Sequence, residues 1–243
     1  MGDVTATAGH AGGAARLARV TTGAYWYVVV GVLLCAASLP SVALLLLLDR
    51  VAANAPLVPL CLVPYGPALS AALYALRERT RAEAPAPARA FGRGYASGFA
   101  DVLRLWVPAT AGLAVVAAGA VNLTAAGLPG SYAVVLAVVA TLVVLWLLDA
   151  TVIATFFSFR ARDVARLAAH YLVAAPRVTV GLVALVVVAA GVVWLTSEAV
   201  LWLFAVVGVA SWLRVARPLV ADVAARFTTS TDITRPDTDT DTD

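Results

Sequence analysis

Long runs of apolar residues, separated by short polar stretches, are the dominant pattern along the chain. A helix that crosses a membrane needs about 20 consecutive apolar residues, because the hydrocarbon core of a bilayer is about 30 Å thick. Six runs approach or exceed this length, so the pattern predicts an all-α polytopic transmembrane helix bundle of about six spans. The runs cover residues 25–48, 56–76, 105–126, 131–154, 178–197 and 199–213.

Composition argues against a soluble globular domain. Apolar residues make up 62% of the chain and charged residues 13%, whereas soluble domains have roughly 45–50% and about 25%. One soluble core could not bury that much apolar surface, so the lipid bilayer is the expected solvent. The net charge is only +3, and no nucleic-acid partner is expected. Cys35 and Cys61 lie inside apolar runs and are expected to be small packing residues.

The arginines predict how the chain is oriented. All 17 basic residues are arginine. With a cytoplasmic N-terminus and six crossings, all of them except Arg50 fall on the inner side, as the positive-inside rule requires. We therefore expect a multi-pass protein of the cell (plasma) membrane with both termini cytoplasmic.

The two ends of the chain differ from its middle. Residues 1–24 are rich in Gly, Ala and Thr and are expected to form a mobile tail ahead of a transmembrane domain over residues 25–217. Residues 218–243 end in alternating Thr and Asp. Such a low-complexity acidic tail cannot bury apolar surface and is expected to be disordered. The Thr-Asp repeat and the absence of lysine favour a halophile as the source.

Two segments on the expected inner side have helical periodicity. Apolar and aromatic residues recur every three or four positions over 91–106, and a similar stripe covers 164–172. Pro108 or Pro176 follows each stripe, where an apolar run begins. We expect two amphipathic helices in the inner interface, each turning into a span at its proline; the alternative is a solvated loop with incidental aromatic residues. Their arginines form a candidate inner-face partner surface: Arg89, Arg93, Arg162 and Arg166.

The second apolar run contains a candidate kink at Pro64, Gly66 and Pro67. Proline costs little in the first turn of a helix, because the N–H groups there lack intrahelical partners anyway. The pattern predicts an extended entry over 55–65 and a short helix over 67–79. The break is either a structural kink or a discontinuous helix that lines a substrate site, as in transporters.

Asp149 and Asn122 are the candidate intramembrane polar residues. Asp149 is the one acidic residue inside a predicted span, and an ionisable group in that position is a functional candidate. It lies about 27 Å along its span, so the alternative is a structural ion pair with Arg104 or Arg160 near the inner interface. Asn122 is expected to form an interhelical hydrogen bond.

The sequence contains no recognisable catalytic or metal-binding constellation. His10 and His170 are far apart, and no His, Cys or Asp cluster has the spacing of metal ligands. We therefore expect no enzymatic activity and no cofactor.

Four segments of the chain resemble the YesL-like integral membrane proteins, a domain-of-unknown-function family. They are LLCAASLP at 33–40, GPALSAALYALRE at 66–78, FGRGYASGFADVLRLWVPA at 91–109 and FSFRARDVARLAAHYLVAAPRVTVGLVAL at 157–185. The chain departs from the family in the additional stretch 41–63. Family members are often encoded beside sugar-uptake systems, so the resemblance implies a role accessory to carbohydrate uptake. It carries over no catalytic or binding residue.

The alternative function is a transmembrane subunit of an ABC-permease-like transporter for a small solute. In that case the inner helices would contact an ATPase subunit of the uptake system. Permeases use a Glu-Ala-Ala…Gly…Leu-Pro loop for this contact. This chain has Gly94 and Trp106-Val107-Pro108 at almost that spacing, but Ala88 stands where the Glu would fall.

Overall fold

The structure, a computed structural model, describes residues 4–79, 86–123, 125–157, 159–195 and 205–228. Across these residues the regular structure is entirely helical, which confirms the predicted all-α fold. The elements are α1 (Val4–Leu46), the short 3₁₀ helix η1 (Ala52–Asn54), α2 (Leu57–Cys61), α3 (Tyr65–Glu78), α4 (Pro87–Val121), α5 (Ser131–Phe156), α6 (Ala161–Ala174), α7 (Pro176–Leu195) and α9 (Ala205–Thr228).

Three helices of the described part are long and apolar enough to cross a membrane: Thr21–Leu46 of α1, all of α4 and all of α5. The number rises to four if α6 and α7, which meet at a bend of 95°, count as one broken span. The predicted six spans are therefore not confirmed. The second apolar run is divided among α2, α3 and the turns around them, because it contains several prolines. The junction between the fifth and sixth predicted runs, residues 197–199, lies outside the described residues.

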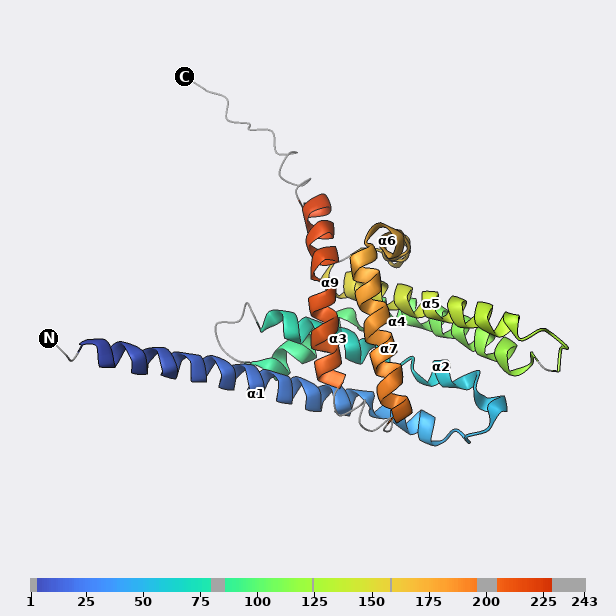
Figure 1. Ribbon diagram of the computed structural model, residues 1–243, viewed down its shortest axis with the longest axis horizontal. Helices are drawn as coiled ribbons and strands as arrows, with labels where there is room; N and C mark the ends of the chain where they lie inside the picture. The colour runs from blue at the N-terminus through green and yellow to red at the C-terminus, as the bar shows by residue number, and fades with distance from the viewer. Residues whose placement is uncertain (1–3, 80–85, 124, 158, 196–204, 229–243) are drawn as a thin grey trace, which may run out of the picture.

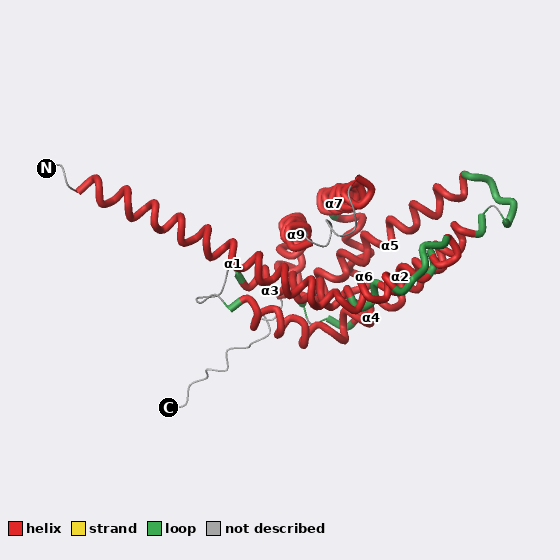
Figure 2. The backbone as a smooth tube through the Cα atoms, turned by 90° about the horizontal axis from the view of Figure 1, so that it is seen from below, coloured by secondary structure: helices red, strands yellow, loops and turns green. Residues whose placement is uncertain are grey.

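The helices run in two main directions. Figure 1 shows α1, α4 and α5 lying lengthwise, with η1, α2 and the turn between α4 and α5 toward the same end of the molecule. In the same view α7 and α9 lie across that direction, and Figure 2 shows them nearly end-on. From the N-terminus the chain runs along α1 toward the end that holds η1, and it returns through α2 and α3. It then runs along α4 toward the same end and returns along α5. The C-terminal end of α3, the N-terminal end of α4 and the C-terminal end of α5 lie away from the end of the molecule that holds η1 and the turn between α4 and α5.

Glycines let α3 pack closely along α4. A Cβ on Gly66 would overlap the indole ring of Trp106, and one on Gly94 would come within 2.7 Å of the Tyr74 side chain. This packing begins in the middle of α4 and continues toward its N-terminus, so that half of α4 is braced by protein. Phe91, at the start of the predicted stripe, is buried in the shared core.

The expectation that α4 would turn into a span at Pro108 is wrong. Pro108 lies inside one continuous helix of 35 residues. Proline is tolerated inside membrane helices where neighbouring helices and Ser or Thr side chains support the backbone, and the Thr110 hydroxyl donates to the Trp106 carbonyl at 2.8 Å. At Pro176 the predicted change of direction is confirmed, because α6 ends at Ala174, two residues before the proline, and α7 begins at Pro176, with 95° between the two helices.

Helices include part of each stretch that was expected to form a tail. α1 begins at Val4, so the stretch expected as an N-terminal tail over 1–24 is helical from that residue onward. Helix extension from a formed segment is cheap compared with nucleation, and this stretch is rich in alanine. At the other end, α9 passes through Pro218 and reaches Thr228. The remainder of the predicted acidic tail lies outside the described residues.

Candidate functional site

A pocket of about 970 Å³ lies where the C-terminal end of α1, the segment 49–65, α4 and α5 meet. Its interior is mainly aliphatic, with Leu69, Leu113 and Leu147 on three different helices. The volume is near the upper end of the roughly 300–1,000 Å³ that small-molecule sites occupy. Sequence reasoning missed this pocket, because its walls are far apart along the chain.

The polar groups of the pocket interior are engaged within the protein. The indole Nε1 of Trp106 donates to Thr151 Oγ1 at 3.0 Å, and the Thr110 hydroxyl donates to a backbone carbonyl of its own helix. The ring of Tyr65 packs edge-on against Trp106, with ring centroids 6.5 Å apart. The interior therefore offers aromatic and aliphatic contact surface, which suits an apolar occupant.

Charged residues lie only at the rim of the pocket. Asp49 and Arg50 are both exposed, and neither side chain has a partner among the described residues. Asn54 stabilises the backbone of the rim, because its amide Nδ2 donates a hydrogen bond to the backbone carbonyl of Asp49 at 3.1 Å. An occupant would thus meet a cation and an anion at the entrance and apolar surface beneath them.

The predicted kink forms part of the structure that builds this pocket. Pro64 is the residue before α3, and Gly66 and Pro67 occupy its first turn. The predicted extended entry over 55–65 is wrong, because short helical turns, including α2, occupy this stretch. Pro56 and Pro64 take helical backbone angles there, with φ of −62° and −66°, which are the angles that the proline ring favours. The break places Tyr65 and Leu62 on the pocket wall.

Asp149 lies elsewhere, in the interior of the helix bundle. It is 1% exposed, and its Oδ1 has no hydrogen-bond partner among the described residues. The predicted ion pair with Arg104 is wrong, because the Arg104 guanidinium pairs with Asp101 at 2.8 Å on the exposed side of α4. Arg160, the other predicted partner, is exposed.

Asn122 is also outside the pocket. It is exposed at the end of α4, and its Nδ2 donates to the Ala118 carbonyl of the same helix at 2.8 Å. The predicted interhelical hydrogen bond is therefore wrong. A side-chain amide at a helix end can reach the unsatisfied carbonyls of its own last turn, and Asn122 does so here.

The four arginines of the predicted partner surface are all exposed. Arg89 and Arg93 lie on the N-terminal half of α4, and Arg162 and Arg166 lie on α6. None of these guanidinium groups has a partner in the described part of the chain. In contrast, Arg77 lies over the ring of Phe156 at 4.4 Å.

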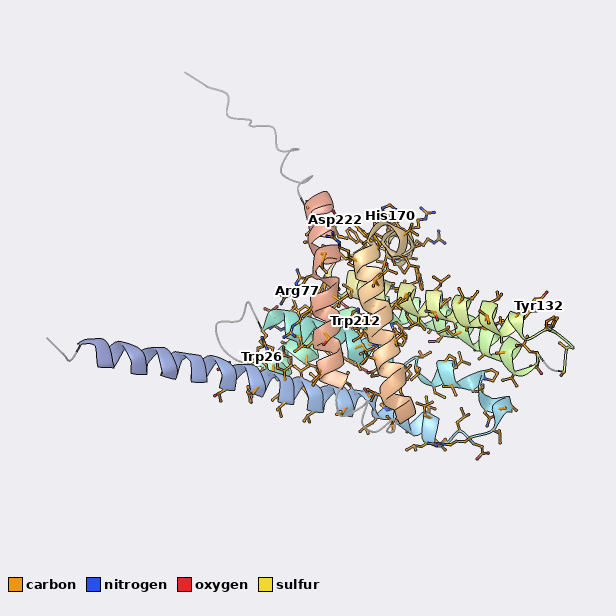
Figure 3. All side chains as sticks on the ribbon, viewed as in Figure 1. Trp26, Arg77, Tyr132, His170, Trp212 and Asp222 are labelled. Carbon is orange, nitrogen blue, oxygen red and sulfur yellow. The ribbon has the colours of Figure 1, made fainter. Side chains whose placement is uncertain are left out.

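The arginine-bearing end is held together by contacts between helices. The Tyr171 hydroxyl of α6 donates to Asp222 Oδ2 of α9 at 2.6 Å, and the Trp146 indole of α5 donates to the Ala165 carbonyl at 3.0 Å. Figure 3 shows Asp222 near His170 on α6, and Tyr132 far away at the opposite end of α5. These bonds fix α6 between α5 and α9.

The fold defines a membrane-embedded helical protein. Compared with models of protein families, with curated proteins and with solved structures, the chain matches none. The resemblance to the YesL-like proteins stays a prediction.

Proposed function

We propose that this chain is a non-enzymatic integral membrane protein of the plasma membrane, accessory to carbohydrate uptake. Its working surface is the inner face, where Arg89, Arg93, Arg162 and Arg166 contact membrane or ATPase subunits of the uptake system. The observation that supports the proposal is that all four side chains are exposed and lack partners in the described part of the chain. The resemblance to YesL-like proteins supplies the link to carbohydrate uptake.

The chemistry of these side chains suits a protein partner. An exposed guanidinium presents several donors in a planar fork that matches carboxylate groups on a partner. The N-terminal half of α4 and the helix α6 are both braced by neighbouring helices, so their arginines are presented on rigid supports. The orientation that makes this face cytoplasmic follows from the positive-inside rule.

Co-purification from native membranes tests this proposal. Two double variants, Arg89→Gln with Arg93→Gln and Arg162→Gln with Arg166→Gln, are compared with Arg214→Gln and Arg217→Gln, an exposed pair on α9. Glutamine removes the charge while keeping much of the side-chain length. We expect partner recovery to fall in the first two variants and to stay unchanged in the third, with equal membrane insertion in all three. Equal recovery of the partner from all three would reject the proposal.

A transmembrane subunit of an ABC-permease-like transporter is the second candidate function. The observation that favours it is the position of the broken segment Pro64–Pro67 beside a large pocket, as in transporters with discontinuous helices. Uptake of radiolabelled solutes in cells distinguishes the two functions. Loss of uptake in Leu113→Trp, with partner recovery unchanged, would favour the transporter.

A further inference from the structure

We propose that the pocket binds one membrane phospholipid, with an acyl chain in its interior and its phosphate at Arg50. This inference is independent of the proposed function, since it concerns the outer end of the molecule and needs no uptake system. It follows from the interior, the rim and the surroundings of the pocket, taken in turn.

The interior selects an apolar occupant. The indole N–H of Trp106 and the hydroxyl of Thr110 already have acceptors, so they offer no free donor to a sugar or another polar solute. A polar solute would lose its hydrogen bonds to water without replacement, and burial of unsatisfied polar groups is unfavourable. Apolar cavities are poor sites for water as well, so a hydrocarbon chain is the occupant that fits.

The charged residues at the rim determine which lipid head group the pocket can bind. Arg50 is the one arginine that the sequence places on the outer side, and its guanidinium can donate two parallel hydrogen bonds to phosphate oxygens. Asp49 beside it gives the rim one negative charge for the one positive charge. Arg50 can neutralise the single negative charge of a phosphodiester. A head group with several negative charges would fit less well, because its additional charges would lie near Asp49.

The surroundings of the rim supply the route of entry. Leu46, Leu47 and Val51 are 79%, 81% and 55% exposed, and all three lie at the mouth or next to it. In a bilayer such side chains face hydrocarbon. A lipid next to the protein can therefore move one chain sideways into the pocket without leaving the membrane.

Native mass spectrometry of the purified full chain tests the proposal. The protein is stripped of lipid in detergent and titrated with dioleoylphosphatidylglycerol or with dioleoylglycerol, which has the same chains without phosphate. We expect one phosphatidylglycerol per chain to survive collisions that remove loosely bound lipid. Retention of dioleoylglycerol should be about tenfold lower, as expected for loss of charge-assisted hydrogen bonds.

Variants separate the pocket from the general lipid-facing surface. Leu113→Trp fills the interior and should lower lipid retention by about tenfold or more, because the occupant loses its volume. The control Val115→Trp lies on the same helix at a residue that is 73% exposed and does not line the pocket, so retention should not change. Val144→Phe, at a lining residue on α5, is a second filling variant in case Leu113→Trp fails to fold.

Variants at the rim test the head-group contact. Arg50→Gln should lower phosphatidylglycerol retention by about tenfold and leave dioleoylglycerol retention unchanged, while Arg217→Gln on α9 should change neither. Equal retention in Leu113→Trp, Val144→Phe and Val115→Trp would overturn the proposal. Loss of a dimer in the filling variants, without loss of lipid, would show that a second copy of the chain occupies the pocket instead. Equal binding of both lipids by the unaltered protein would refute the phosphate contact.

Discussion

The indole nitrogen of Trp106 on α4 donates a hydrogen bond to Thr151 Oγ1 on α5, with 3.0 Å between the two atoms. Trp106 is 6% exposed and Thr151 is fully buried. The bond joins α4 and α5, two helices long and apolar enough to cross a membrane, at the wall of the pocket. Trp106 also fills the space beside Gly66 on α3, so one side chain positions three helices.

A double-mutant cycle should measure this bond. Trp106→Phe and Thr151→Val each remove one partner, and we expect a coupling free energy of about 0.6 kcal/mol and at most about 1.7 kcal/mol, as for other hydrogen bonds between membrane helices. The measurement is reversible unfolding of the protein in mixed micelles. A coupling energy of zero would show that the two groups find other partners when separated.

Gly66→Ala should destabilise the protein. The new Cβ would overlap the Trp106 ring, and overpacking of this kind typically costs about 1–3 kcal/mol. Gly92→Ala is the matched control, since that glycine is in α4 and the added methyl group would meet no neighbouring atom within 4 Å. The control should be neutral or more stable by up to about 1 kcal/mol, because alanine favours helix more than glycine does. Equal thermal stability of the two variants would contradict the close packing of α3 on α4.

Asp149→Leu should leave the fold intact and raise its thermal stability. The carboxyl Oδ1 is buried without a hydrogen-bond partner among the described residues, so replacing it with a similarly sized apolar group removes a cost of about 1–3 kcal/mol. Asp101→Leu, at the exposed ion pair with Arg104, should change stability by less than about 1 kcal/mol. Thermal unfolding in detergent compares them. A large loss of stability in Asp149→Leu would show that Asp149 binds a partner such as a cation.

Cysteine labelling should place the two ends of the bundle on opposite sides of the membrane. In a background without Cys35 and Cys61, we expect Ala53→Cys and Gly130→Cys to react with an impermeant maleimide in intact cells. Arg93→Cys and Arg162→Cys should react only after the membrane is opened, because arginine-rich segments stay inside. All four positions are exposed in the structure. Labelling of Arg93→Cys in intact cells would reverse the orientation.

The apolar pattern predicted the helices whose stability depends on local sequence and on the bilayer. α5 and the part of α1 from Tyr25 onward correspond to uninterrupted apolar runs, and the bend before Pro176 follows from the restriction that proline places on its neighbours. The pattern failed where a distant segment decides the outcome. α4 continues through Pro108 because α3 packs beside it, and this packing depends on Gly66 and Gly94 meeting Trp106 and Tyr74.

The pocket could not be predicted for the same reason. Its rim is at residues 49–54 and its walls extend to Leu148, and no spacing rule relates segments so far apart. The sequence did indicate the break at Pro64, Gly66 and Pro67 and the alternative that it lines a site. The partner of Asp149 was predicted wrongly, because helix position gives depth in the membrane but not the direction in which a side chain faces.

The length of α4 determines how far its N-terminal arginines lie from the bilayer. Its 35 residues make a helix about 52 Å long, whereas the hydrocarbon core is about 30 Å thick. With Val121 at one boundary of the hydrocarbon core, the other boundary falls near the exposed pair of Asp101 and Arg104. Arg89 and Arg93 are then carried about 12–18 Å beyond it on a helix braced by α3. α4 thus holds Arg89 and Arg93 at a fixed distance from the bilayer, and any partner that binds these arginines would lie at that distance.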